Sequence, residues 1–175
     1  MGDPRKAKKT FRRPRQIWTT ESLNTELYVA GSYGLRNKRE LWKAQTEVAR
    51  MRNQARALLA LSSEVRHEKE TRLLRFLSRY GLVSETATLD DILNLKVEDL
   101  LERRLQTIIM KKISSKSPYY ARQIVSHGHV SIGNRIVNIP GYLVKKDEES
   151  QILLHVDVGG SGSGPQPAQA AAPPS

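Results

Sequence analysis

The spacing of apolar residues changes at Gly128, and this change limits the chain to folds that combine helices with strands. Before Gly128, apolar residues recur every three or four positions, which is typical of helices that pack on one face. The pattern predicts helices over residues 19–30, 37–58, 68–80, 89–95, 97–112 and 118–127. After Gly128 the period is two, which predicts strands over 129–132, 135–138, 142–145 and 152–158, with turns at 133–134 and 147–150. Helices followed by strands indicate an α+β fold.

Polar residues and a proline mark two of the helix starts. Asn37 is a candidate helix cap, and Glu40 is placed three residues later, where it can reach back to form a capping box. Pro118 follows Ser117, a second candidate cap. Proline favours the first position of a helix because it has no amide hydrogen to leave unbonded there.

The two ends of the chain differ in composition from the middle. Residues 1–15 carry seven basic side chains and one acidic one, and they lack the apolar stretch of a secretory signal. Residues 159–175 hold no charge and consist of Gly, Pro, Ala, Ser and Gln, which cannot bury enough surface to fold. We expect a disordered basic extension at 1–15 and a flexible tail at 159–175. No stretch is apolar for long enough to predict a membrane span.

Positive charge dominates the sequence and is concentrated in blocks. The chain has 29 Lys and Arg against 18 Asp and Glu, a formal net charge of +11. Residues 31–60 carry seven basic side chains against two acidic ones, and residues 101–125 carry six against one. Residues 61–100 between them are mildly acidic. Together with the basic extension, these blocks indicate a polyanion that contacts the chain at several places.

Motifs for catalysis and for metal binding are missing from the sequence. The chain has no cysteine, so it has no disulfide, no thiolate metal site and no cysteine nucleophile. It has no glycine-rich phosphate loop, and neighbouring Ser126 and His127 would point in different directions at a helix end. His127 and His129 could bind zinc or copper, but no carboxylate between Glu102 and Asp147 supplies a third ligand nearby. We expect no enzyme activity, no metal and no cofactor.

Three clusters of basic and aromatic residues are candidates for the polyanion surface. The first, residues 33–42 (YGLRNKRELW), places three cations at a helix start. The helix dipole disfavours cations there unless an external anion neutralises them. The second cluster covers residues 102–112 and the third covers residues 116–122. Cations spread over two helices and the loop between them favour recognition of structured RNA through its backbone and shape.

The same segments resemble a known family. Residues 102–107 (ERRLQT), 121–125 (ARQIV), 128–130 (GHV) and 137–140 (VNIP) are similar to the S-four RNA-binding module, named after a small-subunit ribosomal protein. Residues 33–42, together with 89–93 (LDDIL) and 98–107 (EDLLERRLQT), are similar to the ribosomal protein family itself, in its archaeal and eukaryotic branch. The chain departs from the family at residues 114–116 (SSK), where relatives often have Gly and Ala.

The resemblance implies a division of the chain and a function. Residues 16–100 would form a helical ribosomal-protein domain, and residues 101–158 a module of two helices and a small antiparallel sheet. The chain would be a structural constituent of the small ribosomal subunit in the cytoplasm. It would bind small-subunit ribosomal RNA early in assembly and organise a multi-helix junction there. A position near the messenger RNA entrance, beside other small-subunit proteins and messenger RNA, is also implied, with no membrane.

The clusters and the resemblance together predict a set of RNA-binding residues. The predicted residues are Arg36, Asn37, Lys38, Arg39, Lys43, Arg50, Arg103, Arg104, Gln106, Lys111, Lys116, Ser117, Tyr119, Arg122, His127, His129, Asn134 and Arg135.

Other functions remain open at this point. A free-standing RNA-binding regulator could carry the same module, but it should lack the segment at residues 33–42. An RNA-modifying enzyme would need a catalytic domain beside the module, and the region between the two ends leaves no room for one. DNA binding is the remaining possibility for so basic a chain.

Overall fold

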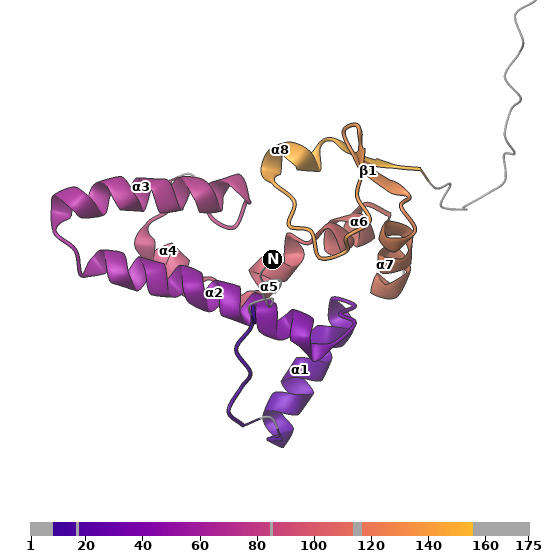
Figure 1. Ribbon diagram of the computed structural model, residues 1–175, viewed down its shortest axis with the longest axis horizontal. Helices are drawn as coiled ribbons and strands as arrows, with labels where there is room; N and C mark the ends of the chain where they lie inside the picture. The colour runs from indigo at the N-terminus through magenta and orange to yellow at the C-terminus, as the bar shows by residue number, and fades with distance from the viewer. Residues whose placement is uncertain (1–8, 17, 85, 114–116, 156–175) are drawn as a thin grey trace, which may run out of the picture.

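The computed structural model of the chain describes residues 9–16, 18–84, 86–113 and 117–155 (Figure 1). The helices are α1 (Thr20–Ser32), α2 (Lys38–Leu59), α3 (Ser63–Arg79), α4 (Leu89–Asn94), α5 (Val97–Glu102), α6 (Leu105–Ile113), α7 (Pro118–Ser126) and α8 (Lys146–Glu149). The strands are β1 (Val130–Ile132), β2 (Arg135–Ile136) and β3 (Ile152–Leu154). Helices followed by a small sheet confirm the α+β prediction. No helix in these residues is long and apolar enough to cross a membrane.

Several predictions fall on residues outside the described ranges. They are the flexible tail at 159–175, residues 1–8 of the basic extension, the end of the last predicted strand at 156–158, and Lys116.

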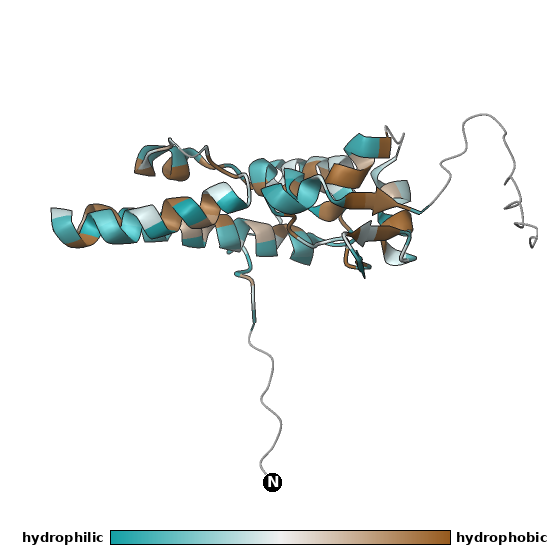
Figure 2. Ribbon diagram, turned by 90° about the horizontal axis from the view of Figure 1, so that it is seen from above, coloured by the Kyte–Doolittle hydropathy of each residue, from teal (hydrophilic) through white to brown (hydrophobic). Residues whose placement is uncertain are grey.

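The amino-terminal part, α1 to α5, is organised around α2, the longest helix (Figure 1). The buried face of α2 follows the predicted three-and-four spacing and consists of Leu41, Trp42, Ala44, Val48, Ala55 and Leu58. Except for Trp42, these side chains share one core with residues of the neighbouring helices, such as Leu77 of α3, Ile92 of α4 and Leu101 of α5. Figure 2 shows that α3 also combines the two kinds of residue, because hydrophilic and hydrophobic bands alternate along this helix.

The carboxy-terminal part, α6 to β3, has a second core of its own. α6 and α7 pack against each other and against a three-stranded antiparallel sheet in the order β2-β1-β3. Val130 pairs with Leu154 across the sheet, and Ser131 lies between Ile136 and Leu153. Figure 1 shows these elements at one end of the molecule, with α3 and α4 at the other.

Local sequence signals at the helix ends are confirmed. The Asn37 side chain accepts a hydrogen bond from the Glu40 backbone N–H at 3.1 Å, and Pro118 is the first residue of α7. Gly128 follows the end of α7 with a φ of 76°, a left-handed conformation that suits glycine. The second half of the predicted capping box is wrong, because the Glu40 carboxylate turns to two arginines of the carboxy-terminal part instead.

The continuous helix predicted over residues 97–112 is wrong. The structure has two helices, α5 and α6, which are separated at Arg103 and Arg104. Arg104 forms an isolated antiparallel bridge with Leu143, and Val144 N–H donates to the Arg103 carbonyl at 3.0 Å. The interruption thus follows from contacts with a segment about 40 residues away, which the local period of apolar residues cannot reveal.

The strand predicted over residues 142–145 is also wrong, because this segment forms only the bridge between Leu143 and Arg104. The acidic turn predicted at 147–150 is a short helix, α8. Glu148 stabilises its start by accepting hydrogen bonds from Lys145 N–H at 3.2 Å and from the Tyr142 hydroxyl at 3.0 Å. The alternation of side chains at residues 142–145, from which the strand is predicted, therefore belongs to a bridge and to the start of a helix.

The predicted start of the third helix at residue 68 is wrong as well. α3 begins at Ser63, and Arg66 N–H already donates to the Ser62 carbonyl at 2.9 Å. The first turn of α3 is largely exposed, and Val65 is its single apolar residue. It therefore lacks the apolar period on which the prediction depended.

Candidate RNA-binding surface

Glu40 on α2 binds two arginines of the carboxy-terminal part. Its Oε2 accepts from Arg104 Nη2 at 3.0 Å, and its Oε1 accepts from Arg122 Nη2 at 2.9 Å. The Arg104 side chain is 7% exposed, and those of Glu40 and Arg122 are 25% and 21% exposed. A mostly buried group of one carboxylate and two guanidiniums therefore holds the two parts of the chain together. We call this group the Glu40 triad.

The arginines set the charge state of Glu40. Burial alone would raise the pKa of the Glu40 carboxyl. The hydrogen bond from Arg122 and the charge of Arg104 outweigh burial, so the pKa lies below its ordinary value of 4.5. Burial also lowers the pKa of Arg104, which Glu40 opposes. An arginine keeps its proton at neutral pH, so the triad holds two positive charges against one negative charge.

Gln106 fastens the loop before α2 to the start of α7. Its side chain is fully buried, and Nε2 lies within hydrogen-bond distance of three carbonyl oxygens. These belong to Tyr33 at 3.3 Å, Gly34 at 3.1 Å and Pro118 at 2.9 Å. Arg122 Nη1 approaches Gln106 Oε1 at 3.4 Å, which connects this contact to the Glu40 triad. The first predicted cluster is thereby brought against the second and the third.

Other cations of the predicted surface are free of such contacts. The side chains of Arg36, Arg39, Lys43, Arg50 and Arg135 are exposed and form no ion pair among the described residues. Three of these cations lie at the start of α2, directly beside the loop that Gln106 holds. An exposed cation without an acidic partner in its own chain can neutralise the charge of an external phosphate.

Comparison with known families identifies both parts of the chain. The model of the Ribosomal protein S4/S9 N-terminal domain matches residues 5–102, and the model of the S4 domain, the S-four module predicted above, matches residues 103–150. The chain belongs to the uS4 family. It is 54% identical over 154 residues to small ribosomal subunit protein uS4 of Cenarchaeum symbiosum, covering 88% of this chain and 75% of the relative.

Two further archaeal relatives bear the same name. The uS4 protein of Nitrosopumilus maritimus is 55% identical over 152 residues, which are 87% of this chain and 76% of the relative. That of Ignicoccus hospitalis is 54% identical over 152 residues, which are 87% of this chain and 92% of the relative.

Membership in the uS4 family confirms the predicted resemblance to the archaeal and eukaryotic branch of the family, and the relatives named above are archaeal. Proteins of this family are structural proteins of the small ribosomal subunit, so the predictions of a non-enzymatic chain and of a place in that subunit are confirmed.

The predicted RNA-binding residues differ in how exposed their side chains are. The exposed ones are Arg36, Asn37, Arg39, Lys43, Arg50, Lys111, Tyr119, His127, His129, Asn134 and Arg135. Of these, Lys111 is paired with Glu102 at 2.9 Å. The half-buried ones are Lys38, Arg103, Ser117 and Arg122. Arg104 and Gln106 are buried and have internal partners, so the interface proposed below omits both.

Two half-buried cations also have acidic partners within the chain. Lys38 Nζ lies 3.1 Å from Glu26 of α1, and Arg103 Nη1 lies 2.9 Å from Glu149 of α8. Arg103 Nη2 further donates to the Val144 carbonyl at 3.2 Å. These ion pairs stabilise contacts between helices, and they leave less positive charge for an external anion.

Sequence reasoning assigned Glu40 only to a helix cap and missed its role between the two parts. The available signal was its position as the one acidic residue among the cations of residues 33–42. An acid in such surroundings meets arginines wherever the basic segments pack together.

His155 lies near His129, and no motif in the sequence indicates this. The rings of His127 and His129 are 6.3 Å apart, and His155 follows β3 on the neighbouring strand. Its N–H donates to the His129 carbonyl at 2.9 Å, and its Nε2 lies 2.8 Å from Ser131 Oγ. No group of three or more His, Asp or Glu side chains in the part of the chain described by the structure could hold a metal ion.

Proposed function

We propose that the chain binds small-subunit ribosomal RNA through the exposed cations at the start of α2 together with the exposed polar residues of the S4 domain. The observation that carries the proposal is the packing of these two surfaces side by side. Gln106 and the Glu40 triad bring the loop before α2 against α7. Arg36 follows Gly34 in that loop, and Tyr119 follows Pro118 in α7. A rigid surface with separated cations suits an RNA of fixed shape.

We further propose that the chain is a primary binder, which contacts the RNA before other proteins, organises a multi-helix junction during assembly and lies near the messenger RNA entrance. The family resemblance supports these details. Since the exposed cations come from both matched domains, two RNA segments can be held at a fixed separation without help from another protein. Neighbouring small-subunit proteins and messenger RNA are the further partners of this proposal.

Binding to small-subunit ribosomal RNA should weaken steeply with salt. Each neutralised phosphate contributes about −0.7 to −0.9 to the slope of log affinity against log salt concentration. Replacement of both Arg36 and Arg39 by Ala should therefore make the slope shallower by about 1.5. The measurement is a filter-binding titration of the RNA with the purified chain at several salt concentrations.

A matched control is Arg75→Ala on α3, because Arg75 is an exposed arginine in the mildly acidic region of the sequence. This variant should keep the original slope. A slope near zero for the unsubstituted chain would refute RNA binding by phosphate contacts. Equal slopes for all variants would remove Arg36 and Arg39 from the interface.

The alternative is a free-standing regulator that uses the same S4 domain on another RNA. The match of the S4/S9 N-terminal domain over residues 5–102 supports the ribosomal assignment, because a regulator would not need that part. Sedimentation separates the two functions. A ribosomal protein should remain with small subunits after a high-salt wash, whereas a regulator should be recovered in the free fraction.

A further inference from the structure

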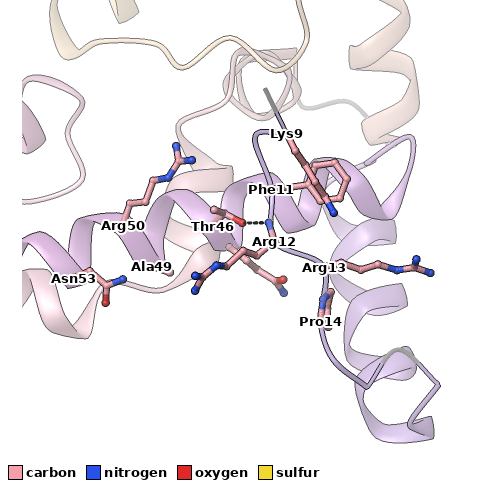
Figure 3. Close-up of a pocket in the computed structure, with 10 residues that line it drawn as sticks. Lys9, Phe11, Arg12, Arg13, Pro14, Thr46, Ala49, Arg50 and Asn53 are labelled. Atoms are coloured by element: carbon pink, nitrogen blue, oxygen red, sulfur yellow. Dashed lines mark hydrogen bonds between the residues drawn. The ribbon is translucent and has the colours of Figure 1, made fainter. Parts of the chain in front are cut away.

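Residues 9–14, which we call the head segment, lie against α2 although they are rich in charge. The Phe11 ring packs on the Trp42 ring, with 5.9 Å between their centroids. Arg12 N–H donates to Thr46 Oγ1 at 3.0 Å, and Lys9 Nζ lies 5.1 Å from the centre of the Phe11 ring. Figure 3 shows this bond and the head segment crossing α2 beside Thr46. One aromatic contact and one hydrogen bond thus fix the position of the segment.

An open hollow of about 680 Å³ lies between the head segment and α2. Its charged lining residues are Lys9, Arg12, Arg13 and Arg50, and no acidic residue of the described part of the chain lines it. Figure 3 shows Arg12 of the head segment extending over α2 toward Asn53, Arg50 extending from α2 in another direction, and Arg13 pointing away from the helix. Four cations without a carboxylate repel one another, and an anion in the hollow would relieve that repulsion.

We propose that this hollow binds a phosphate group of an RNA strand, at a site separate from the S4 domain. The exposed side chains of Arg12 and Arg50 both line the hollow and would turn into it to hold the phosphate oxygens, and Asn53 can donate a further hydrogen bond. Arginine presents a planar fork of donors that matches phosphate oxygens in pairs. The inference rests on the proposed function, and it names a contact outside the clusters that carry that function.

The shape of the hollow favours a strand over a small free anion. Its volume falls in the range of pockets that hold ligands as large as a nucleotide, and its open side lets a chain pass through. The cations come from two segments, the head segment and α2. Binding of a phosphate between them would therefore tie the head segment to the helix more firmly than Phe11 and Arg12 do alone.

The first test is a double-mutant cycle with Arg12→Ala and Arg50→Ala on RNA affinity at several salt concentrations. If both arginines hold the same phosphate, each single variant should make the salt slope shallower by about 0.7 to 0.9, and the double variant by about the same amount. Additive losses, or no loss at all, would overturn the site. Arg56→Ala is the matched control, since Arg56 is an exposed arginine of α2 that does not line the hollow.

The second test uses the absence of cysteine from the chain. Ala49 lines the hollow and is exposed, so Ala49→Cys provides a single attachment point for a short photo-cross-linker. In reconstituted small subunits we expect a cross-link to ribosomal RNA, and its yield should fall several-fold when Arg12→Ala and Arg50→Ala are added. A cross-link to a protein instead, which an acidic partner segment would give, overturns the proposal, and so does no cross-link.

The two failures can be told apart by the variants at the start of α2. If the unsubstituted chain does not bind the RNA, the proposed function fails. If it binds and the Arg36 and Arg39 variants lower the salt slope while the Arg12 and Arg50 variants do not, only the site in the hollow fails.

Discussion

Replacement of Glu40 by Gln is expected to lower the free energy of unfolding by about 2 kcal/mol. The substitution keeps the size of the side chain and removes the charge that holds Arg104 and Arg122. Loss of one partner from a buried ion pair leaves the other charge desolvated without compensation, and here two positive charges would remain close together. The partial exposure of Glu40 and Arg122 keeps the expected loss below that of a fully buried pair.

The measurement is urea unfolding of the purified chain, with Glu47→Gln as the matched control. Glu47 lies on the same helix and loses the same charge, but it is exposed and belongs to no ion pair of the described residues. The control should change the free energy of unfolding by no more than about 0.5 kcal/mol. Equal effects of the two substitutions would mean that the triad does not stabilise the fold.

The pH dependence of stability gives an independent check on the same carboxylate. The pKa of Glu40 is lower in the folded chain than its ordinary value of 4.5. Its contribution to stability is therefore fully present above pH 4.5 and is lost as the pH falls through the lower pKa of the folded state. The difference in stability between the unsubstituted chain and Glu40→Gln should accordingly shrink in this acidic range.

The triad also changes what the two arginines are expected to do. From the sequence, Arg104 and Arg122 are predicted to contact RNA. In the structure their guanidiniums bind Glu40, so their substitution alters the contact between the two parts of the chain. An effect of either arginine on RNA binding would then act through the relative position of the two surfaces, and a loss of stability should accompany it.

The elements that the sequence predicts well are those with local causes. The cap at Asn37, the start of α7 at Pro118 and the end of α7 before Gly128 each depend on one or two neighbouring residues. The hairpin of β1 and β2 follows from alternation and a two-residue turn. The family resemblance added the order of the two parts. Short motifs of the family can be recognised even where the spacing of apolar residues is irregular.

The features that the sequence did not predict depend on contacts between distant segments. Helix period alone cannot place a break at Arg103 and Arg104, since the cause is their pairing with residues 143–144. The contact of Phe11 is likewise hidden in the sequence. Phe11 stands alone among basic residues there, whereas in the structure its ring packs on Trp42 of α2. A partner about 30 to 40 residues away does not change the local pattern of apolar and polar residues.

The burial of Gln106 shows the same limit at the candidate site. A polar residue between two basic clusters is naturally predicted to face RNA. In the structure its side-chain amide lies within hydrogen-bond distance of three carbonyl oxygens, two in the loop before α2 and one at the start of α7. Buried carbonyl groups need donors, and a glutamine amide can serve two segments at once.

The contact between Gln106 and the loop before α2 leads to the second large expected effect. Replacement of Gly34 by Ala should lower the free energy of unfolding by about 3 kcal/mol. Gly34 has a φ of 58°, which costs an alanine energy even in open space. A Cβ atom there would lie 2.6 Å from Gln106 Nε2 and 2.8 Å from Pro118 Cβ.

Neither neighbour of that Cβ atom can move away easily. Gln106 is fully buried and held by its carbonyl partners, and Pro118 is fixed at the start of α7. The control is Gly31→Ala in α1, where a Cβ atom would meet nothing within 4 Å and the higher helix propensity of alanine should leave stability equal or slightly raised. Urea unfolding of both variants measures the difference. If Gly34→Ala were as stable as Gly31→Ala, the close packing of the loop against Gln106 and Pro118 would be refuted. The fixed relation between the two surfaces of the proposed interface would then depend on the Glu40 triad alone.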